Sequence, residues 1–259
     1  MRRSGRRYRS GRAAEHYDVI VIGSGIGGLS LAALMTKLGK RVCVLEQHYT
    51  AGGFTHSYER EGFEWDVGVH YIGEVHKPHS TLRRLFDVIS DGALKWAPMD
   101  PVYDRIIIGD RRVNFTAGRG ALADNLIAQF SAEEAAIRHY IELIDETAGA
   151  AQKFFAGQAM PRWLGRTYQA ARPMLVPKNC FRSVREVLEE LTQDQELIGV
   201  LTGQWGDYGM VPRDASFLMH ATVVKHYFGG GSYPVGGSWK IPDTIVPVIR
   251  AGGGEVFTY

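Results

Sequence analysis

The sequence predicts an α/β protein with a Rossmann-like nucleotide-binding unit that begins near Tyr17. Three features in succession predict it. The run Val19-Ile20-Val21-Ile22 is β-branched throughout, which is typical of a strand buried on both faces of a parallel sheet. The turn Gly23-Ser24-Gly25-Ile26-Gly27-Gly28 follows it, and after a predicted helix a second strand, residues 41–45, ends in Glu46. This succession, a strand, a G-x-G-x-x-G turn, a helix and a second strand that ends in an acidic residue, indicates a dinucleotide-binding unit.

Each glycine of the turn has its own reason to lack a side chain. Gly23 permits the sharp exit from the strand, Gly25 lets backbone N–H groups approach a pyrophosphate, and Gly28 lets the next helix lie close to the sheet. The phosphates would lie at the helix N-terminus, where unpaired N–H groups and the positive end of the dipole point. A glycine-rich turn alone is a weak signal, because tight loops are common. The flanking strands and the acid favour dinucleotide binding.

Glu46 lies 23 positions after Gly23, close to the distance at which an acid accepts the hydroxyls of an adenosine ribose. A 2′-phosphate would meet like charge there, which disfavours NADP. Gly52 and Gly53 form a second place where backbone could pass close to the pyrophosphate, although alone they would equally suit an ordinary loop. The predicted cofactor-binding residues are Gly23, Ser24, Gly25, Ile26, Gly27, Gly28, Glu46, Gln47, Gly52 and Gly53.

Composition places the chain among ordinary globular proteins. Its 259 residues suit one large domain or two modest ones, and 45% are hydrophobic and 22% charged. No run reaches the ~18 apolar residues of a membrane-spanning helix. The only cysteines, Cys43 and Cys180, form no disulfide framework, which predicts a reducing, cytoplasmic setting. Five histidines between 48 and 79 lack metal-ligand spacing, so no metal is predicted.

The net charge of +2 conceals a basic amino-terminal segment. Residues 1–12 hold six arginines and no acid, so the remainder of the chain carries 2 − 6 = −4. This composition predicts a disordered basic tail over residues 1–16. The tail is interpreted either as a solvated segment or as a surface attracted to anionic lipid, which would give the protein a peripheral membrane contact.

Beyond the nucleotide unit, periodicity and turn residues predict further elements. Residues 80–90 place apolar side chains on one helical face, and residues 102–115 indicate a β-hairpin around Gly109-Asp110. Ser131 and Glu134 predict a capping box that opens one long helix reaching Phe155. Prolines at 161, 173 and 177 predict that residues 157–182 are loop with one short helix.

The last third of the chain predicts three more helices and a strand. Ser183 and Glu186 indicate another capping box. Residues 214–228 are apolar nearly all round, which predicts a helix buried in the core or one that also faces an apolar guest. A helix with Ile245, Val248 and Ile249 precedes residues 255–259, which are expected to return to the nucleotide sheet as a strand.

Three motifs together carry a family resemblance. The G-x-G-x-x-G, Glu46, Gly52-Gly53 series is followed by Gly62-Phe63-Glu64-Trp65-Asp66-Val67-Gly68-Val69-His70-Tyr71-Ile72-Gly73 and later by Tyr233-Pro234-Val235-Gly236-Gly237-Ser238. The chain resembles the start of the FAD-dependent phytoene desaturase, carotenoid isomerase and retinol saturase family. His70-Tyr71-Ile72-Gly73 is similar to the retinol saturase branch in particular. The resemblance runs from about Tyr17 to Tyr259, with a loosely matched middle.

This resemblance implies a glutathione-reductase-type FAD-binding domain with an inserted α+β substrate domain, truncated at the C-terminus. It implies FAD as the cofactor, with a missing carboxyl-terminal half that would contact the isoalloxazine. It also makes His70 and Tyr71 candidates for lining the reacting region, although both could be satisfied loop residues. The expected domains are residues 17–80 for the first part of the FAD unit, 81–232 for the substrate, and 233–259 for the return to the FAD unit.

The resulting hypothesis is an FAD-dependent oxidoreductase, or its amino-terminal part, that acts on carbon–carbon bonds of an apolar isoprenoid polyene such as a carotenoid or retinoid. No catalytic acid or base is assigned. Two alternatives stay open. The first is a non-catalytic prenyl- or lipid-binding protein of the Rab GDP-dissociation inhibitor type, whose fold is similar. The second is an amine oxidase-like flavoenzyme. No nucleic-acid partner is expected.

Overall fold

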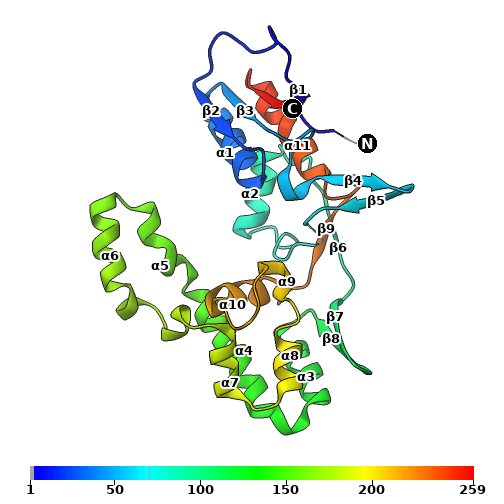
Figure 1. Ribbon diagram of the computed structural model, residues 1–259, viewed down its shortest axis with the longest axis vertical. Coiled ribbons are helices and arrows are strands. Elements are labelled where there is room, and N and C mark those ends of the chain that lie inside the picture. Colours follow the sequence, from blue (N-terminus) through cyan, green and yellow to red (C-terminus); the bar gives the residue numbers. More distant parts are fainter. Residues whose placement is uncertain (1–2, 70) are drawn as a thin grey trace. The chain divides into compact units, whose positions relative to one another are not determined.

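The computed structural model describes residues 3–69 and 71–259, and these form two compact units (Figure 1). Unit 1 comprises residues 1–99 and 231–259, and unit 2 comprises residues 100–230. The expected boundary at residue 81 differs from this division, because residues 81–99 belong to unit 1. There helix α2 (Thr81–Ile89) packs its buried Phe86 and Ile89 into the same core as the nucleotide-binding strands.

Unit 1 contains a four-stranded parallel sheet in the order β1-β10-β3-β2. Strand β3 lies between β2 and β10, so the end of the chain returns to the sheet as predicted. The predicted α/β fold class with a parallel sheet is therefore confirmed. The strands are β1 (Arg6–Arg7), β2 (Val19–Ile22), β3 (Val42–Leu45) and β10 (Glu255–Thr258).

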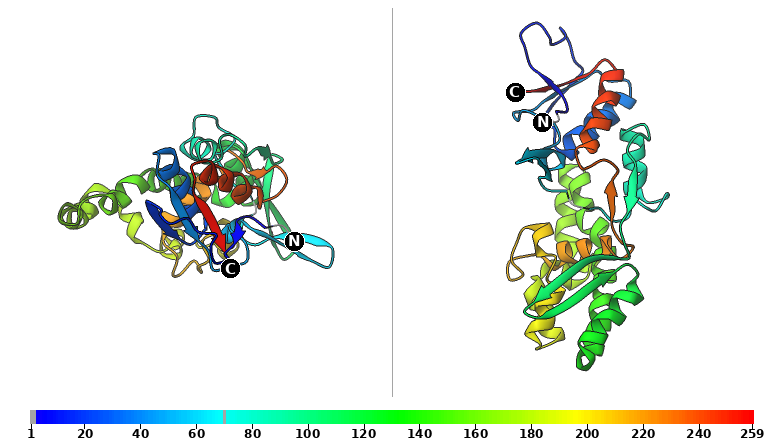
Figure 2. Two further views of the ribbon diagram at one scale, coloured as in Figure 1. Left: turned by 90° about the horizontal axis from the view of Figure 1, so that it is seen from above. Right: turned by 90° about the vertical axis from the view of Figure 1, so that its right-hand side faces the viewer.

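Two helices cover one face of this sheet. Helix α1 (Ile26–Lys37) follows the glycine-rich turn, and helix α11 (Lys240–Ala251) packs beside it (Figure 2). The buried side chains of both helices are apolar, and removing them from water stabilises the unit. The core of unit 1 includes Val21, Leu29, Ala32, Ala33, Val42, Val44, Ile241, Ile245, Ile249 and Val256.

The opposite face of the sheet is open at β2. Because side chains alternate along a strand, Val21 points into the core while Ile20 and Ile22 point away from it. Ile22 is 88% exposed, and Leu45 on the neighbouring strand is exposed as well. The prediction that this strand is buried on both faces is therefore wrong for the chain described here. An unbroken β-branched run indicates a strand suited to two-sided burial, but it cannot show what covers each side.

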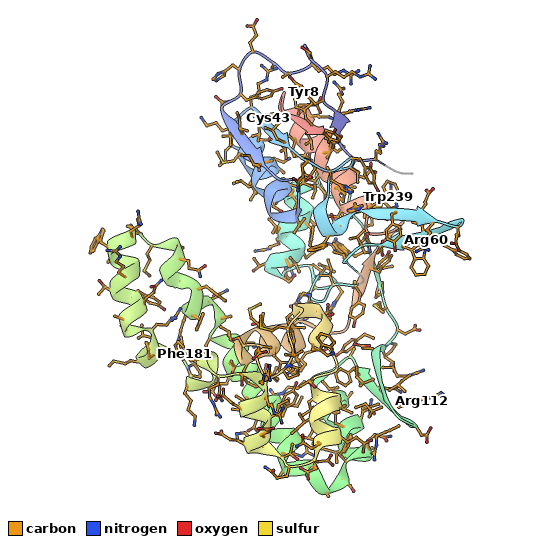
Figure 3. The ribbon with its side chains drawn as sticks, viewed as in Figure 1. Tyr8, Cys43, Arg60, Arg112, Phe181 and Trp239 are labelled. Carbon is orange, nitrogen blue, oxygen red and sulfur yellow. The ribbon has the colours of Figure 1, made fainter. Side chains whose placement is uncertain are left out.

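The basic amino-terminal segment does not match the disordered tail predicted from its composition. Arg6 and Arg7 extend the sheet as β1, pairing in parallel with Phe257 and Thr258. Ser4 is buried, and the ring of Tyr8, which is labelled in Figure 3, packs edge-on against the ring of Phe257. Strand β10 would otherwise present unpaired N–H and C=O groups, and β1 satisfies them. Pairing over so long a sequence separation leaves no sign in local composition.

Smaller elements complete unit 1. A 3-10 turn and an antiparallel hairpin follow the second glycine pair, and a further antiparallel strand pair joins the two sequence segments of the unit. Their bounds are η1 (Gly53–Thr55), β4 (Ser57–Arg60), β5 (Phe63–Asp66), β6 (Trp96–Pro98) and β9 (Ser232–Pro234).

Unit 2 combines a β-hairpin with a group of helices. The hairpin is confirmed as predicted, and α4 packs on α10, with Tyr140 and Phe217 among the fully buried side chains. Apart from the arm that follows α4, its elements are β7 (Val102–Ile108), β8 (Arg111–Thr116), α3 (Arg119–Gln129), η2 (Ser131–Glu133), α4 (Glu134–Gly149), η4 (Lys178–Phe181), α7 (Val184–Leu191), α8 (Gln195–Leu201), α9 (Trp205–Tyr208) and α10 (Phe217–His226).

Two helix predictions in unit 2 are wrong and one is confirmed. Ser131 does not cap a helix, because residues 131–133 form a 3-10 turn, and the helix that follows ends at Gly149 rather than at Phe155. Ser183 and Glu186 form the predicted capping box.

The segment predicted as loop with one short helix, residues 157–182, contains the fourteen-residue helix α6 (Arg162–Leu175), which is longer than expected. It follows two short elements, α5 (Ala151–Phe155) and η3 (Ala156–Ala159). Pro161 precedes the helix and Pro173 lies in its last turn, so neither proline interrupts the hydrogen bonding of its middle.

Candidate dinucleotide-binding site

The glycine-rich turn connects β2 to α1 as its spacing predicts. Gly23 has a φ of 94°, a left-handed conformation that favours glycine, and its N–H donates to the Leu45 carbonyl of β3. Helix α1 starts at Ile26, with Gly25 as its N-cap residue and no side-chain hydrogen bond to the cap. The first N–H groups of a helix have no intrahelical partner. The turn therefore presents donors and a positive dipole end without a side chain over them.

The surroundings of this turn fit a dinucleotide diphosphate. A Cβ placed on Gly25 or on Gly27 would have no heavy atom within 4 Å, so the backbone faces open space at both positions. That space is what a phosphate needs in order to approach the N–H groups, and it is what a side chain would fill.

Gly28 meets a different constraint. A Cβ at this position would lie 2.1 Å from the Gly23 carbonyl oxygen and 3.4 Å from Cγ1 of Val21. The first turn of α1 thus lies directly against the end of β2, as the third glycine of the motif predicts. Gly28 is required by packing, whereas Gly25 faces open space.

The second glycine pair lies beside the first turn. Gly25 and Gly52 form a parallel bridge, and the Gly52 N–H donates to the Ser24 carbonyl at 3.1 Å. A Cβ on Gly53 would lie 2.9 Å from Cα of Gly25. Gly52 itself has a φ of 128° and lies against Pro242 of α11. The two loops, predicted separately from sequence, form one surface of bare backbone.

Ser24 joins the two loops to the acid at the end of β3. Its N–H and its hydroxyl both donate to Oε2 of Glu46, at 2.9 and 2.5 Å, and its hydroxyl accepts the Gly52 N–H at 3.2 Å. The His48 N–H donates to Oε1 of Glu46 at 2.8 Å. Sequence reasoning included Ser24 only as a member of the turn, and it missed this linking role. A serine between two motif glycines was the available signal.

Glu46 is held as a carboxylate. Partial burial acts against ionisation, but the hydrogen bonds from Ser24 and His48 outweigh it, and the pKa of Glu46 lies below its ordinary value. Hydrogen bonds to the charged form favour that form. A carboxylate has about four lone-pair directions, and three are used by these donors. The remaining capacity is what an adenosine hydroxyl would meet.

The other two predicted residues of the site have no such partners. Ile26 is the first residue of α1 and is partly exposed, and Gln47 is exposed just beyond Glu46. Their contact with a cofactor stays a prediction.

A second cluster joins the other two motifs, and Asp66 lies at its centre. The Tyr233 hydroxyl donates to Oδ2 of Asp66, and the Ser238 hydroxyl donates to Oδ1 at 2.6 Å. Burial, with the Asp66 carboxylate as a further cause, raises the pKa of Tyr233 to about 12. Tyr233 therefore stays protonated at neutral pH and remains a donor. Sequence reasoning noticed both motifs but did not predict that Asp66 connects them.

The two catalytic candidates have different outcomes. His70 lies outside the described residues. Tyr71 is half-buried in unit 1, where its ring lies against Gly231. The next residue, Ile72, exchanges two backbone hydrogen bonds with Ser232, both at 2.8 Å. Tyr71 is thus fixed beside the segment that begins the Tyr233–Ser238 motif, and its role in catalysis stays a prediction.

Helix α10, predicted from its apolar sequence, contains one buried histidine that the sequence analysis did not single out. His220 of α10 is fully buried, and its Nε2 and Nδ1 lie 2.9 and 3.2 Å from the hydroxyls of Tyr140 and Tyr208. Burial lowers the pKa of His220 to about 3. A neutral imidazole has one donor and one acceptor, which these two hydroxyls satisfy. This arrangement indicates a core contact rather than an open ligand site.

The chain is similar to a family model and to several known proteins. A family model described as an NAD(P)-binding Rossmann-like domain matches residues 21–89. All-trans-retinol 13,14-reductase of Danio rerio is 40% identical over 253 residues, covering 95% of this chain and 42% of that protein. The Homo sapiens protein of the same name is 37% identical over 259 residues, with 97% and 42% covered. The chain thus spans about two fifths of the length of these curated relatives.

A shorter match and two solved structures complete the comparison. Prolycopene isomerase 2 of an Oncidium hybrid cultivar is 53% identical over 55 residues, covering 21% of this chain and 9% of that protein. An oxidoreductase from Methanosarcina mazei matches with a TM-score of 0.62 at 18% identity, covering 93% of this chain and 50% of that one. A Rab GDI from Plasmodium falciparum matches with a TM-score of 0.53 at 16% identity, covering 95% and 58%.

The two structural likenesses show the fold alone, since both identities are low. The sequence likenesses are more specific, because they extend over nearly the whole chain and include the retinol 13,14-reductases that its motifs resemble. The chain is thus similar over nearly its whole length to retinol 13,14-reductases and, over a short stretch, to a prolycopene isomerase.

Proposed function

We propose that this chain is part of an FAD-dependent oxidoreductase that acts on carbon–carbon bonds of an apolar isoprenoid polyene, a carotenoid or a retinoid. The observation that carries the proposal is the bare-backbone surface formed by Gly25, Gly27 and Gly53 at the start of α1, with Glu46 fixed beside it. The names of the relatives support the polyene, since they are retinol reductases and prolycopene isomerases.

Each part of the site has an assigned role in this proposal. The N–H groups at Gly25 and Gly27 would bind the diphosphate, and Glu46 would accept one ribose hydroxyl with its remaining lone pair. Gly52 and Gly53 would border the ribityl chain. When bound, FAD would supply hydride exchange with a substrate carbon. The protein would hold both partners in place and exclude water from them.

The remaining assignments of the proposal concern the substrate and the setting. His70 and Tyr71 would line the reacting region, and the residues expected for the substrate, 81–232, include all of unit 2. Cys43 and Cys180 are free and form no disulfide with each other, as we expect in a reducing, cytoplasmic compartment. Reduction, desaturation and isomerisation of a polyene all fall within this reaction class.

The two alternatives share the fold of the proposed enzyme. A Rab GDI and a putrescine oxidase are both solved structures of similar fold at 16% and 18% identity. The sequence likeness to retinol reductases, at 37–40%, favours the polyene enzyme over a prenyl-binding protein and over an amine oxidase.

A nucleotide-binding experiment tests the cofactor assignment on the chain itself. FAD, FMN and ADP would each be titrated into the purified protein, with flavin fluorescence and competition as readouts. Because the loop would bind the adenosine diphosphate half, FAD should bind, ADP should displace it, and FMN should not bind. FAD that fails to bind, or FMN that binds equally well, would overturn the assignment.

A second experiment tests the substrate class. Retinol, a prenylated peptide and putrescine would be titrated into the FAD-loaded chain, and tryptophan fluorescence would report binding. The proposal predicts a saturable response to retinol only. A response confined to the prenylated peptide would support the Rab GDI-type alternative, and one confined to putrescine would support the amine oxidase-like alternative.

A further inference from the structure

Helices α4 and α7 of unit 2 lie side by side and border a hollow that is separate from the dinucleotide-binding turn (Figure 1). Its volume is about 400 Å³, which falls within the range of small-molecule pockets. The short element η4 also contributes to its lining. Both helices are amphipathic, and no helix among the described residues is long and apolar enough to cross a membrane.

The floor of the hollow is apolar because each helix turns one stripe of side chains toward it. On α4, Ala135, His139 and Leu143 follow one another at steps of four residues. On α7, Val187 and Leu191 have the same spacing. Val187 is buried, and Leu143 and Leu191 are half-buried, so the floor still has apolar surface to offer. Covering that surface with an apolar ligand is favourable.

The rim of the hollow has hydrogen-bond donors that the described residues leave unused. Lys178 and His139 both line it, and neither side chain has an ion-pair or hydrogen-bond partner among the described residues. Asn179 is only 7% exposed, and its Oδ1 accepts a hydrogen bond from Arg182 at 3.4 Å. Because a guanidinium only donates, this contact identifies the amide oxygen and leaves Nδ2 as an unused donor.

The carboxylate that lines the hollow is already neutralised. Glu190 accepts two hydrogen bonds from the Arg182 guanidinium, at 2.6 and 2.7 Å, one to each carboxylate oxygen. These bonds hold the pKa of Glu190 below its ordinary value. A two-bond pair of this kind satisfies both partners. The positive charge of Lys178 is therefore unopposed within the hollow.

A second hollow of unit 2 has similar size but balanced charge. Its volume is about 410 Å³, and its residues Arg185 and Glu189 lie on the side of α7 opposite Val187. Arg185 pairs with Glu189 at 2.6 Å, and the other arginine of the lining, Arg213, pairs with Asp214 at 3.3 Å. Each of these cations has an acid beside it, so this second hollow has no excess positive charge for an anion.

We propose that the hollow between α4 and α7 binds a small monocarboxylate with an apolar body. Lys178 would pair with the carboxylate, a ring N–H of His139 and Nδ2 of Asn179 would donate to it, and the apolar floor would cover the body. An ionised carboxylate accepts hydrogen bonds and donates none, which matches a rim of unused donors. A cation of the same shape would instead be repelled by Lys178.

Binding of dodecanoate to the full 259-residue chain tests the proposal. The test needs neither FAD nor a polyene, so its failure is independent of the proposed function. Calorimetric titration, below the concentration at which dodecanoate forms micelles, should show one saturable site. Dodecanol lacks the charge and should bind at least about tenfold more weakly, and dodecylammonium should not bind there. Octanoate has four fewer methylenes and should also bind at least about tenfold more weakly.

Matched variants locate the site on the chain. Lys178→Glu should weaken dodecanoate binding at least about tenfold, whereas Arg213→Glu makes the same change of charge at the second hollow and should retain binding. Ala136→Phe places a ring in the hollow from α4 and should also weaken binding at least about tenfold. Its control is Val211→Phe in the second hollow.

The outcome that contradicts the proposal is equally specific. Lys178, Arg213 and Val211 are exposed, so their replacement should leave the fold intact, and circular dichroism confirms this for every variant. Absence of saturable dodecanoate binding, equal affinity for dodecanol, or equal losses in Lys178→Glu and Arg213→Glu would overturn the proposal.

Discussion

The glycine-rich turn of unit 1 and helix α10 of unit 2 are two places where the sequence allows contact with a ligand, and they are built in opposite ways. At the turn, Gly25 and Gly27 leave backbone N–H groups facing open space. In α10, the side chains of Phe217, His220 and Val224 are buried and satisfied within the unit. A binding site that depends on glycines can be recognised in a sequence. An apolar helix, by contrast, gives the same pattern whether it faces a guest or a core.

The largest expected effect on stability comes from a substitution in the turn, at Gly28. The Gly28→Ala variant should lose about 3 kcal/mol or more of unfolding free energy, because its Cβ would lie 2.1 Å from the Gly23 carbonyl oxygen and α1 would have to move. Urea unfolding measures this loss. Gly27→Ala is the matched control, since its Cβ meets open space, and it should leave stability unchanged or slightly higher. Equal effects of the two variants would show that the helix is not held against β2.

In unit 2, the burial of His220 predicts how the stability of the protein depends on pH. Its pKa is about 3 in the folded protein, whereas an unfolded histidine titrates near 6.5, so the unfolded state binds the extra proton between these values. The stabilising contribution is complete above about pH 6.5. It should fall by about 1.4 kcal/mol per pH unit as the pH decreases toward 3.

Urea unfolding of wild type and His220→Gln across pH 7 to 4 measures this slope, and the variant should lack it. The control is His139→Gln, which removes an exposed histidine of the same unit and should keep the wild-type slope. If His220→Gln also keeps the slope, the histidine is accessible to protons in the folded state. In that case α10 would be more open than the core described here.

Several outcomes of sequence reasoning follow the range of the interactions involved, although the capping box at Ser131 was wrong at short range and the return of β10 to the sheet was right at long range. The turn, Gly28 and the capping box at Ser183 depend on contacts within about 25 residues, and all were predicted. Strand β1 depends on pairing with β10 near the other end of the chain, and its arginines indicated disorder instead. The exposure of Ile22 depends on what covers a sheet face, which no local pattern records. The same reason hid the link between Asp66 and Tyr233.

The smallest expected effect concerns Ser24. Replacing it with alanine removes the hydroxyl that joins Oε2 of Glu46 to the Gly52 N–H, while the backbone contacts remain. We expect a loss of about 1 kcal/mol in stability and about fivefold in FAD affinity. Calorimetric titration and urea unfolding measure the two. Ser30→Ala, elsewhere on α1, is the control. An FAD affinity unchanged by Ser24→Ala would mean that the loops keep their positions without this bridge.

The most direct test of the central claim is FAD binding by the Gly25→Val variant of the 259-residue chain. Gly25 has a φ of −60°, and its Cβ would contact nothing, so the variant should fold with wild-type stability. Its side chain would, however, occupy the space that the diphosphate needs. Titration should therefore show that FAD affinity falls at least about a hundredfold, by about 3 kcal/mol or more. A folded variant that binds FAD within twofold of wild type would contradict the claim that the dinucleotide lies against this turn.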